Sequence, residues 1–522
     1  MSGFNQATVG GLSYIDLFII FSYVVGVVLI GVYYGKYIKS ASDFFLAGRA
    51  LPFWAIGMSI VVSDIGGTDF LYVGGASYTY GISAANFDWM GSMPAMIIAA
   101  FIFMPYYWRA GVYTVPEFLG RRYNAAVQVI HASIWGSITL VGLAIIFFGT
   151  AKFLNIILGW NYWLGVSVTV VAVGLYTFSG GLTAVVMTDV IQMIIMFVGG
   201  LSLSALSLWE VGGWHALKDK VLAMGPQYAD HFTILRPMSA DNPYPWAGIV
   251  FGLGIVLAMA YFSGNQAIVQ RVFGARSEWD AKGGMLFGGL LKFFVPLMVA
   301  LPGLCAVVLV PGMEKGDNAV PAMIRLLLPA GIRGLTFSAL VASFLSSADT
   351  SLSAASTIWT TDLYGRLHQL IKGRYPGEKH NLYVGRTFTV IFVIGAALAS
   401  KQLEEQKSIY NFMQSLFSMI QGPIFAILLL GIMWKRINQW GGLAGLVLGL
   451  TCSYVLFHVD GLFPAEDPFL FVAWWSFVFS LAVTVVVSLL TPADPEEKTR
   501  GMVFGQVMRD GKIQRVLAQR VE

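Results

Sequence analysis

Residues 63–70 read Ser-Asp-Ile-Gly-Gly-Thr-Asp-Phe, and this short stretch decides which kind of fold to expect. Asp64 and Asp69 flank a glycine pair inside a predicted span, 52–80, that is long enough to cross a membrane. A charged side chain at the centre of a bilayer costs about 2.5–3.5 kcal/mol on insertion scales. Two carboxylates beside two glycines therefore predict a helix that is interrupted around a cavity lined by protein.

The composition shows that this span is one of many. The chain has 522 residues, 57% of them hydrophobic and only 11% charged, and its mean hydropathy is +0.71. We expect an all-α polytopic membrane protein with about 13 transmembrane helices. The predicted spans are 13–34, 52–80, 84–108, 126–158, 162–178, 181–209, 246–272, 283–311, 331–364, 382–400, 408–434, 439–457 and 467–491. Several exceed the length needed to cross, which indicates tilt, kinks or breaks.

The first span lacks the basic start and the small-residue cleavage site of a signal peptide, so we expect it to remain as a helix. Cys305 and Cys452 lie singly in apolar runs, which indicates neither a disulfide framework nor a metal site.

The distribution of basic residues predicts the orientation. One set of alternate loops, with the C-terminal tail, holds 22 Lys and Arg residues, Arg271 among them, and the other set holds 8. Because basic loops stay in the cytoplasm, we expect the N-terminus outside and the C-terminus inside a cell (inner or plasma) membrane. Residues 492–522 are then a cytoplasmic tail, and the outer loop 210–245 a partly helical cap. We expect no nucleic-acid partner and no obligate protein partner.

A second interrupted span matches the first. Residues 260–266 read Ala-Tyr-Phe-Ser-Gly-Asn-Gln, with Gly264 and Asn265 in mid-span, and they lie five spans after the first break. Paired interruptions at corresponding places indicate an inverted-repeat transporter, here with repeats at about 52–209 and 246–434. The alternative is that the glycines only allow close helix packing, which leaves the intramembrane carboxylates unexplained.

Further ionisable residues lie within predicted spans: Asp88, Asp189, Lys292 and Asp349. Each is expected to face a cavity or a partner. Asp189 lies too far into an apolar run for a helix N-cap. For Lys292 an acidic partner or the cavity is favoured over snorkelling to an interface. The amide of Gln414 is compatible in equal measure with a place in the cavity and with a hydrogen bond between two helices.

The span 331–364 is rich in hydroxyls. Ser343, Ser346 and Ser347 share one helical face, and hydroxyls together with the carbonyls of an unwound helix suit Na⁺. Asp349 is on an adjacent face and is a candidate for a second cation or a proton. The alternative is a packing stripe of small residues whose hydroxyls bond to their own helix.

Five segments carry a resemblance to a known family. They are Asp-Phe-Phe-Leu-Ala-Gly-Arg-Ala-Leu-Pro-Phe-Trp (43–54), Gly-Val-Tyr-Thr-Val-Pro-Glu-Phe-Leu-Gly-Arg-Arg-Tyr-Asn (111–124), "GGLTAVVMTDVIQ" (180–192), "GNQAIVQR" (264–271) and "SSADTSLSAASTIWTTDLYGR" (346–366). In this order they resemble the sodium/solute symporter family, within it the sodium/sugar (glucose/galactose) cotransporter branch. The resemblance covers about residues 40–440 and implies inverted five-helix repeats with two broken helices and alternating access, as in amino-acid/Na⁺ symporters.

The resemblance also implies a cation site. Its Na⁺ ligands are the carbonyls of Val62, Ile65 and Ser343 and the hydroxyls of Ser346 and Ser347. Asp189 is the family aspartate coupled to cation binding. Asp349 stands where some members carry a hydroxyl of a second Na⁺ site, so this chain departs from the family there.

The implied solute site consists of Asp64, Asp69, Asp88, Ala258, Tyr261, Lys292 and Gln414. Lys292 and Gln414 match the family, Asp88 is shorter than the usual Glu, and Tyr261 is the aromatic that shields the sugar from the inside. The other three depart, because Asp64 replaces an Asn, Asp69 a Gln or His, and Ala258 an Asn or Thr. Carboxylates accept hydrogen bonds from sugar hydroxyls, but they equally favour a cationic or zwitterionic solute.

These observations predict a secondary active Na⁺-coupled symporter of a small polar solute, a sugar or polyol, and not an enzyme. The chain contains no Walker A sequence that would indicate ATP-driven transport. The alternatives are Na⁺- or H⁺-coupled symport of an amino acid, organic cation or organic acid, a sensor on a transporter fold and, more remotely, an intramembrane aspartyl enzyme.

Overall fold

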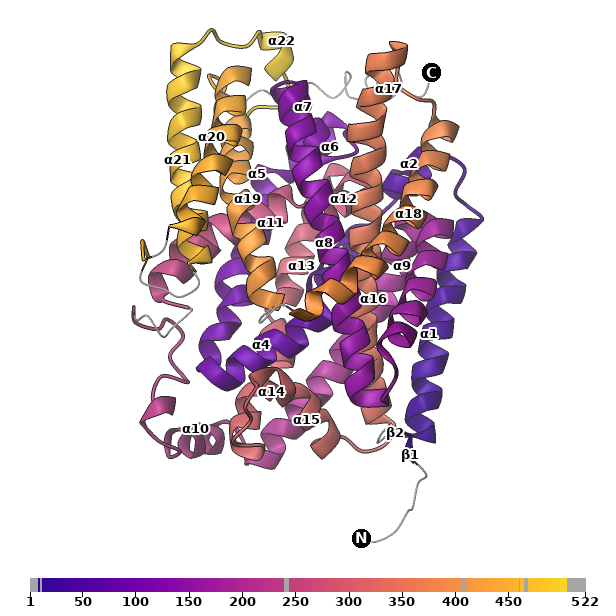
Figure 1. Cartoon of the computed structure of the whole chain (residues 1–522), viewed down its shortest axis with the longest axis vertical. Coiled ribbons are helices and arrows are strands. Elements are labelled where there is room, and N and C mark those ends of the chain that lie inside the picture. Colours follow the sequence, from indigo (N-terminus) through magenta and orange to yellow (C-terminus); the bar gives the residue numbers. More distant parts are fainter. Residues whose placement is uncertain are drawn as a thin grey trace.

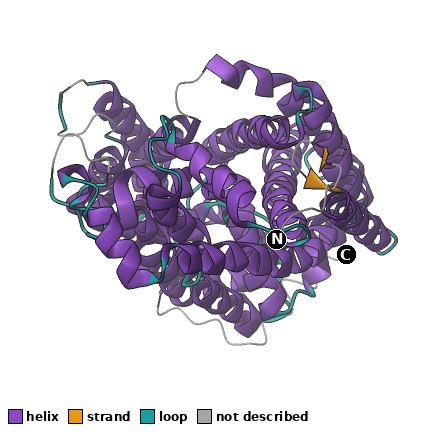
Figure 2. Cartoon of the chain, turned by 90° about the horizontal axis from the view of Figure 1, so that it is seen from below, coloured by secondary structure: helices purple, strands orange, loops and turns teal. Residues whose placement is uncertain are grey.

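The computed structural model describes residues 8–9, 12–238, 244–405, 409–459, 461–463 and 468–504. This part of the chain is a bundle of helices, with one antiparallel pair of two-residue strands, β1 (Thr8–Val9) and β2 (Leu12–Ser13). Figure 1 shows long helices running along the long axis, and Figure 2 shows the bundle from below. Within the described residues eight helices are long and apolar enough to cross a membrane, or up to ten if each bent pair is one span.

Each predicted span coincides with one or more helices. Breaks divide several spans into shorter helices, so a count of long helices is lower than the number of predicted spans. The helices of the spans are α1 (Tyr14–Gly35), α3 (Phe53–Asp64), α4 (Gly67–Tyr80), α5 (Met93–Ile102), α6 (Met104–Ala110), α8 (Ala125–Leu158), α9 (Tyr162–Val211), α11 (Ala258–Gly264), α12 (Gln266–Phe273), α13 (Glu278–Lys292), α14 (Val295–Leu309), α16 (Ile332–Ile358), α18 (Glu378–Ser400), α19 (Ile409–Met433), α20 (Gln439–His458) and α21 (Phe469–Leu490). Shorter helices are α2 (Ala41–Leu46), α7 (Val115–Arg122), α10 (Trp214–Leu222), α15 (Ala319–Leu327), α17 (Gly365–Lys372) and α22 (Glu496–Thr499). The 3₁₀ and π segments are η1 (Ala47–Arg49), η2 (Gly81–Ala85), η3 (Phe87–Ser92), η4 (Pro226–Tyr228), η5 (Gly248–Leu257), η6 (Gly316–Asn318), η7 (Trp359–Tyr364) and η8 (Lys401–Glu405).

The interruption predicted at 63–70 is present. α3 ends at Asp64, Ile65 leaves the helical region with φ −80° and ψ 80°, and α4 begins at Gly67. Glycine is about 1 kcal/mol less favourable than alanine inside a helix, so Gly66 and Gly67 mark the weakest point of this span. The break frees backbone carbonyls at the end of α3 from helical hydrogen bonds.

The second predicted interruption is also present. α11 ends at Gly264, α12 begins at Gln266, and the axis bends by 49° between them. The Asn265 side chain caps α12 by accepting a hydrogen bond from the N–H of Ala267 at 2.9 Å. An asparagine in mid-span therefore has a local structural reason, because it starts the second half-helix.

Close packing of α3 on α13 brings two charged residues together. A Cβ on Gly57 would lie 2.8 Å from the carbonyl oxygen of Gly284 and 2.9 Å from the backbone nitrogen of Gly288. Helices can approach so closely only where glycines stand at the crossing. Asp64 at the end of α3 and Lys292 at the end of α13 consequently meet.

The predicted outer cap, 210–245, is partly helical as expected, with α10 and η4. Figure 1 places α10 at the lower end of the bundle. Within this segment His231 is buried, and its carbonyl accepts a hydrogen bond from Ile82 N–H at 2.7 Å. Its ring Nε2 lies 3.2 Å from the Tyr78 carbonyl. The cap is thus held against the end of α4.

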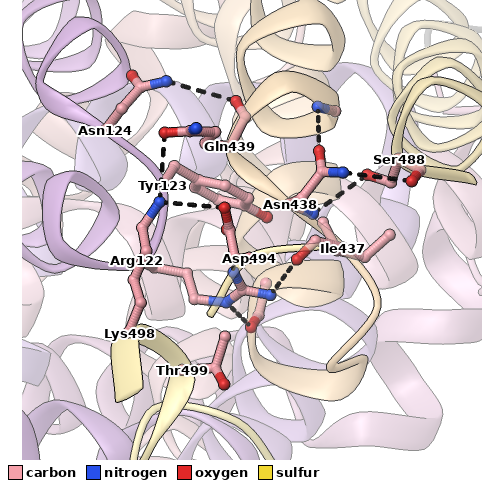
Figure 3. Close-up of polar contacts among 12 residues, drawn as sticks. Arg122, Tyr123, Asn124, Ile437, Asn438, Gln439, Ser488, Asp494, Lys498 and Thr499 are labelled. Atoms are coloured by element: carbon pink, nitrogen blue, oxygen red, sulfur yellow. Dashed lines mark hydrogen bonds and ion pairs between the residues drawn. The ribbon is translucent and has the colours of Figure 1, made fainter. Parts of the chain in front are cut away.

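At the opposite end the beginning of the predicted tail is anchored rather than free (Figure 3). Arg122, the last residue of α7, is fully buried and donates to the carbonyls of Gly431 and Ile437 at 2.7 Å each. Its guanidinium also lies 3.5 Å from Asp494, which pairs with Lys498 at 3.3 Å. Residues 492–504 therefore tie α7 to the α19–α20 connection. The rest of the predicted tail, 505–522, lies outside the described residues.

This anchor predicts a stability effect. Asp494→Asn keeps the size of the side chain but leaves the buried Arg122 guanidinium without its carboxylate, so we expect a loss of about 1–3 kcal/mol. Thermal unfolding of the purified protein in detergent measures it. Glu496→Gln in the same segment is the control, because its pair with Lys435 is solvent-exposed and should contribute nothing measurable. Equal melting temperatures for both variants would contradict the prediction.

Candidate functional site

A cavity of about 230 Å³ lies where the first broken helix faces η3, α11, α13 and α19. The two breaks supply part of its wall, since Ile65, Gly66 and Asn265 line it. All seven residues of the predicted solute site line this cavity: Asp64, Asp69, Asp88, Ala258, Tyr261, Lys292 and Gln414. Segments separated by hundreds of residues in the sequence thus form one polar chamber inside the bundle.

Lys292 is the positive centre of the cavity. Its Nζ donates to Asp88 Oδ1 at 2.7 Å and pairs with Asp64 Oδ2. The lysine is almost entirely buried, so two carboxylates offset the cost of removing its charge from water. The acidic partner predicted for Lys292 is therefore present, and there are two.

Asp69 occupies a different position from the other two acids. It belongs to the first turn of α4, where the free N–H groups of a helix favour negative charge. Its carboxylate accepts a hydrogen bond from the backbone N–H of Gly66. Among the described residues no Lys or Arg forms an ion pair with it.

Aromatic rings form much of the remaining wall. Tyr261 packs edge-to-face against Phe417 at 6.3 Å between ring centroids, and Phe417 lies 6.0 Å from Trp135. All three rings line the cavity. Such a chamber can hold a small polar solute with its apolar faces against rings and its polar groups toward carboxylates.

The serine face of α16 lies against the break at the end of α3. Ser343 Oγ donates to the carbonyl of Ile65 at 2.7 Å, and Ser347 Oγ donates to the carbonyl of Ser63 at 3.0 Å. Because the Ser347 hydroxyl hydrogen points to a carbonyl, the lone pairs of this hydroxyl are left to accept a cation. Val62, the fourth predicted residue here, is buried in the last turn of α3.

Ser346 connects this face to a buried ion pair. Its hydroxyl donates to Asp189 Oδ1 at 2.6 Å and lies 3.0 Å from Ser63 Oγ. Asp189 is fully buried in α9, and Arg271 of α12 pairs with its Oδ2 at 3.1 Å. The cation-coupling residue predicted at Asp189 thus contacts one of the predicted Na⁺ ligands directly.

The position of Arg271 corrects the sequence analysis, which counted it among loop cations. It lies in the last turn of α12, is 1% exposed, and its guanidinium bonds to the hydroxyls of Ser59, Ser63 and Thr350. Every residue of α12 is buried, so this second half of the broken span, including the end that carries Arg271, is enclosed by protein. An unpaired Asp189 in an apolar helix was the available signal that a basic partner had to exist.

Asp349 is buried in α16 beside this network but does not line the cavity. The hydroxyl of Thr350 lies 3.3 Å from its Oδ1. Because Thr350 also contacts Arg271 and Ser63, Asp349 is linked through one side chain to the residues around Asp189.

A profile of the sodium:solute symporter family matches residues 44–449. The chain belongs to this family. The family resemblance predicted from five segments is therefore confirmed, and this symporter is a multi-pass membrane protein of a transporter family, not an enzyme. Its activity is Na⁺-coupled transport of a solute.

Curated relatives cover nearly the whole symporter. The sodium/glucose cotransporter of Vibrio parahaemolyticus is 30% identical over 93% of this chain and 92% of that protein. Sodium/glucose cotransporter 1 of Oryctolagus cuniculus is 30% identical over 91% of this chain and 78% of that protein. The sodium/myo-inositol cotransporter of Canis lupus familiaris is 30% identical over 89% and 71%.

Solved structures confirm the predicted fold class of this symporter. A Na⁺-coupled sialic acid symporter in a substrate-bound outward-open state aligns with a TM-score of 0.82 at 20% identity, over 93% of this chain and 99% of that one. Mhp1, a nucleobase-cation-symport-1 family transporter in a closed conformation, aligns at 0.55 and 12% identity, over 88% and 97%. Both alignments show that this chain shares the fold of those two transporters.

Proposed function

We propose that this symporter imports a sugar or polyol together with Na⁺ through the cavity between its two broken helices. The observation that carries the proposal is the convergence of seven predicted solute residues on one chamber whose wall continues into the serine face of α16. The curated relatives are named for glucose and myo-inositol, which are both small and rich in hydroxyls. Carboxylates accept hydrogen bonds from such groups, and the rings pack on their C–H faces.

The proposed Na⁺ site lies between the α3 break and α16. Its ligands are the carbonyls of Val62, Ile65 and Ser343 and the hydroxyls of Ser346 and Ser347. Carbonyl and hydroxyl oxygens are the hard ligands that this ion prefers. Asp189 is proposed to couple the site to its surroundings through Ser346, and Asp349 to serve a second cation or a proton.

Coupling between Na⁺ and the solute follows because Ile65 and Ser347 belong both to the proposed Na⁺ site and to the wall of the cavity. Na⁺ at the break holds α3 and α16 together in the outward-open state and orders the solute site, and each ligand then increases the affinity for the other equally. The occluded protein opens inward and releases both. The membrane potential contributes about 2.3 kcal/mol per charge for each 100 mV.

We further propose the cell (inner or plasma) membrane as the location, with the N-terminus outside and the C-terminus in the cytoplasm. The basis is the excess of basic residues in one set of loops. The two repeats, at about 52–209 and 246–434, would then have opposite orientations in the lipid bilayer. No obligate protein partner is proposed.

The decisive test is uptake by proteoliposomes that contain the purified full chain. Labelled hexoses, inositol, amino acids and organic cations are offered with and without an inward Na⁺ gradient. Accumulation of a hexose or inositol only with Na⁺ supports the proposal. Na⁺-dependent accumulation of an amino acid or organic cation alone would overturn the solute class while leaving Na⁺ coupling in place.

Ser347→Ala tests the cation site. Removal of the hydroxyl deletes one proposed Na⁺ ligand, so the Na⁺ concentration for half-maximal uptake should rise roughly tenfold or more. The control is Ser338→Ala in the same helix, because within the described part of the chain the Ser338 hydroxyl donates only to the Gly334 carbonyl one turn earlier. Unchanged Na⁺ dependence in Ser347→Ala would remove this residue from the site.

Asp349→Ala tests whether a second cation is involved. If Asp349 binds Na⁺, the variant should lower the Hill coefficient for Na⁺. If it binds a proton, the pH dependence of uptake should disappear instead. Uptake measured against Na⁺ and against pH separates these cases, and no change in either would make Asp349 a structural residue.

A further inference from the structure

The cavity carries more negative than positive charge. Among the described lining residues the acids are Asp64, Asp69 and Asp88, whereas Lys292 is the sole basic side chain. Three carboxylates against one ammonium leave a formal excess of two negative charges. Asp189 and Asp349 are not in the lining, and Asp189 has Arg271, so neither changes this local balance. A buried charge excess is costly unless a bound cation offsets it.

Lys292 is already committed to two of the three acids. It pairs with Asp64 and Asp88, and the side chain of Tyr261 also interacts with Asp64. Asp69 has the Gly66 N–H, and among the described residues no Lys or Arg lies within ion-pair distance of it, although Lys292 is near. Asp69 is therefore the acceptor in this cavity that is best placed to meet a positive group on the solute.

The walls of the cavity suit the same kind of group. Tyr261, Trp135 and Phe417 present aromatic rings to the chamber, and aromatic faces attract ammonium ions. Ile65 and Ser347 of the proposed Na⁺ site line the cavity too. One Na⁺ there, Lys292 and one ammonium on the solute would together balance the three carboxylates.

We infer that the preferred solute bears a positively charged amine beside its hydroxyls, as a protonated amino sugar does, and that Asp69 binds this ammonium group. The inference rests on the proposed function, because it assigns the solute of that same cavity. Asp69 is then a specificity-determining residue that separates a cationic sugar from its neutral counterparts.

The test compares three sugars that differ at one substituent. Unlabelled glucose, glucosamine and N-acetylglucosamine each compete with labelled glucose for Na⁺-driven uptake in proteoliposomes. The pH is one that keeps the amine of glucosamine protonated. Glucosamine should compete roughly tenfold better than the other two, because an ammonium–carboxylate hydrogen bond is stronger than a neutral one. The advantage should disappear at a pH that deprotonates the amine, with glucose uptake at both values as the reference.

Asp69→Asn assigns the effect to one side chain. This variant should reduce the preference for glucosamine over glucose roughly tenfold, measured as the ratio of the two sugars in the same preparation. Asp219→Asn in the exposed helix α10 is the control, because it removes a carboxylate far from the cavity lining. If Asp69→Asn does not fold, the pH test on the unaltered protein still decides.

The outcomes separate the two proposals. Na⁺-driven uptake of glucose with no advantage for glucosamine would overturn the inference and leave the proposed function intact. A glucosamine preference that Asp69→Asn does not change would remove Asp69 from the recognition. Absence of Na⁺-driven uptake for all three sugars and for inositol would overturn the proposed function itself.

Discussion

Arg271→Met is expected to abolish Na⁺-dependent uptake and to destabilise the folded protein by about 3–5 kcal/mol. The guanidinium is buried and is shared between Asp189 and three hydroxyls, from Ser59, Ser63 and Thr350. Without it Asp189 becomes an unpaired carboxylate inside the bundle. The same hydroxyls also lose the donor that orients them beside the proposed cation site.

A double variant separates stability from coupling. Arg271→Met combined with Asp189→Asn removes both charges, and replacing a whole buried pair is often close to neutral for stability. Its melting temperature should return toward that of the unaltered protein, whereas Na⁺-dependent uptake should stay absent because Ser346 has lost its carboxylate partner.

The control is Arg276→Met, since Arg276 is 59% exposed and its pair with Asp280 is partly hydrated. It should change melting by little. Were Arg271→Met as stable as this control, the pair with Asp189 would not be a structural contact. If the double variant kept Na⁺-driven uptake, Asp189 would have no part in coupling.

The broken helices could be predicted because their cause is local. Gly66, Gly67 and Asn265 disfavour or cap a helix wherever they stand, and a carboxylate in an apolar span requires a cavity. The seven cavity residues came together as the family resemblance implied. Local chemistry and family order were therefore sufficient for the fold and for these seven of the lining residues.

An acidic partner for Lys292 could be expected, but which charged residues pair with one another could not be predicted, because pairing depends on packing between distant segments. Arg271 and Asp189 are 82 positions apart, and Lys292 and Asp88 are 204 apart. A basic residue near a span end was assigned to a loop, whereas the burial of all residues of α12 shows that Arg271 lies inside the protein. The ion pair between Asp494 and Arg122 could not be predicted for the same reason.

Lys292→Met is expected to reduce uptake at least a hundredfold at neutral pH. Asp64 and Asp88 both depend on this lysine, and its loss leaves three carboxylates in one cavity without a resident cation. Like charges in a low-dielectric chamber repel strongly, so the cavity should either distort or take up protons. Uptake against substrate concentration should show a raised KM as well as a lowered maximum rate.

The pH dependence of residual uptake shows whether Lys292 acts by balancing the charge of the acids or by contacting the solute. If the lysine acts by neutralising the acids, residual uptake in Lys292→Met should rise as the pH falls, because protonation then replaces the missing charge. Asp88→Asn added to Lys292→Met should have the same effect at neutral pH. Lys282→Met in the same helix is the control, since Lys282 pairs with Glu278 away from the cavity. Residual uptake that is independent of pH, and that Asp88→Asn does not restore, would mean that Lys292 contacts the solute directly and does not serve mainly to balance the acids.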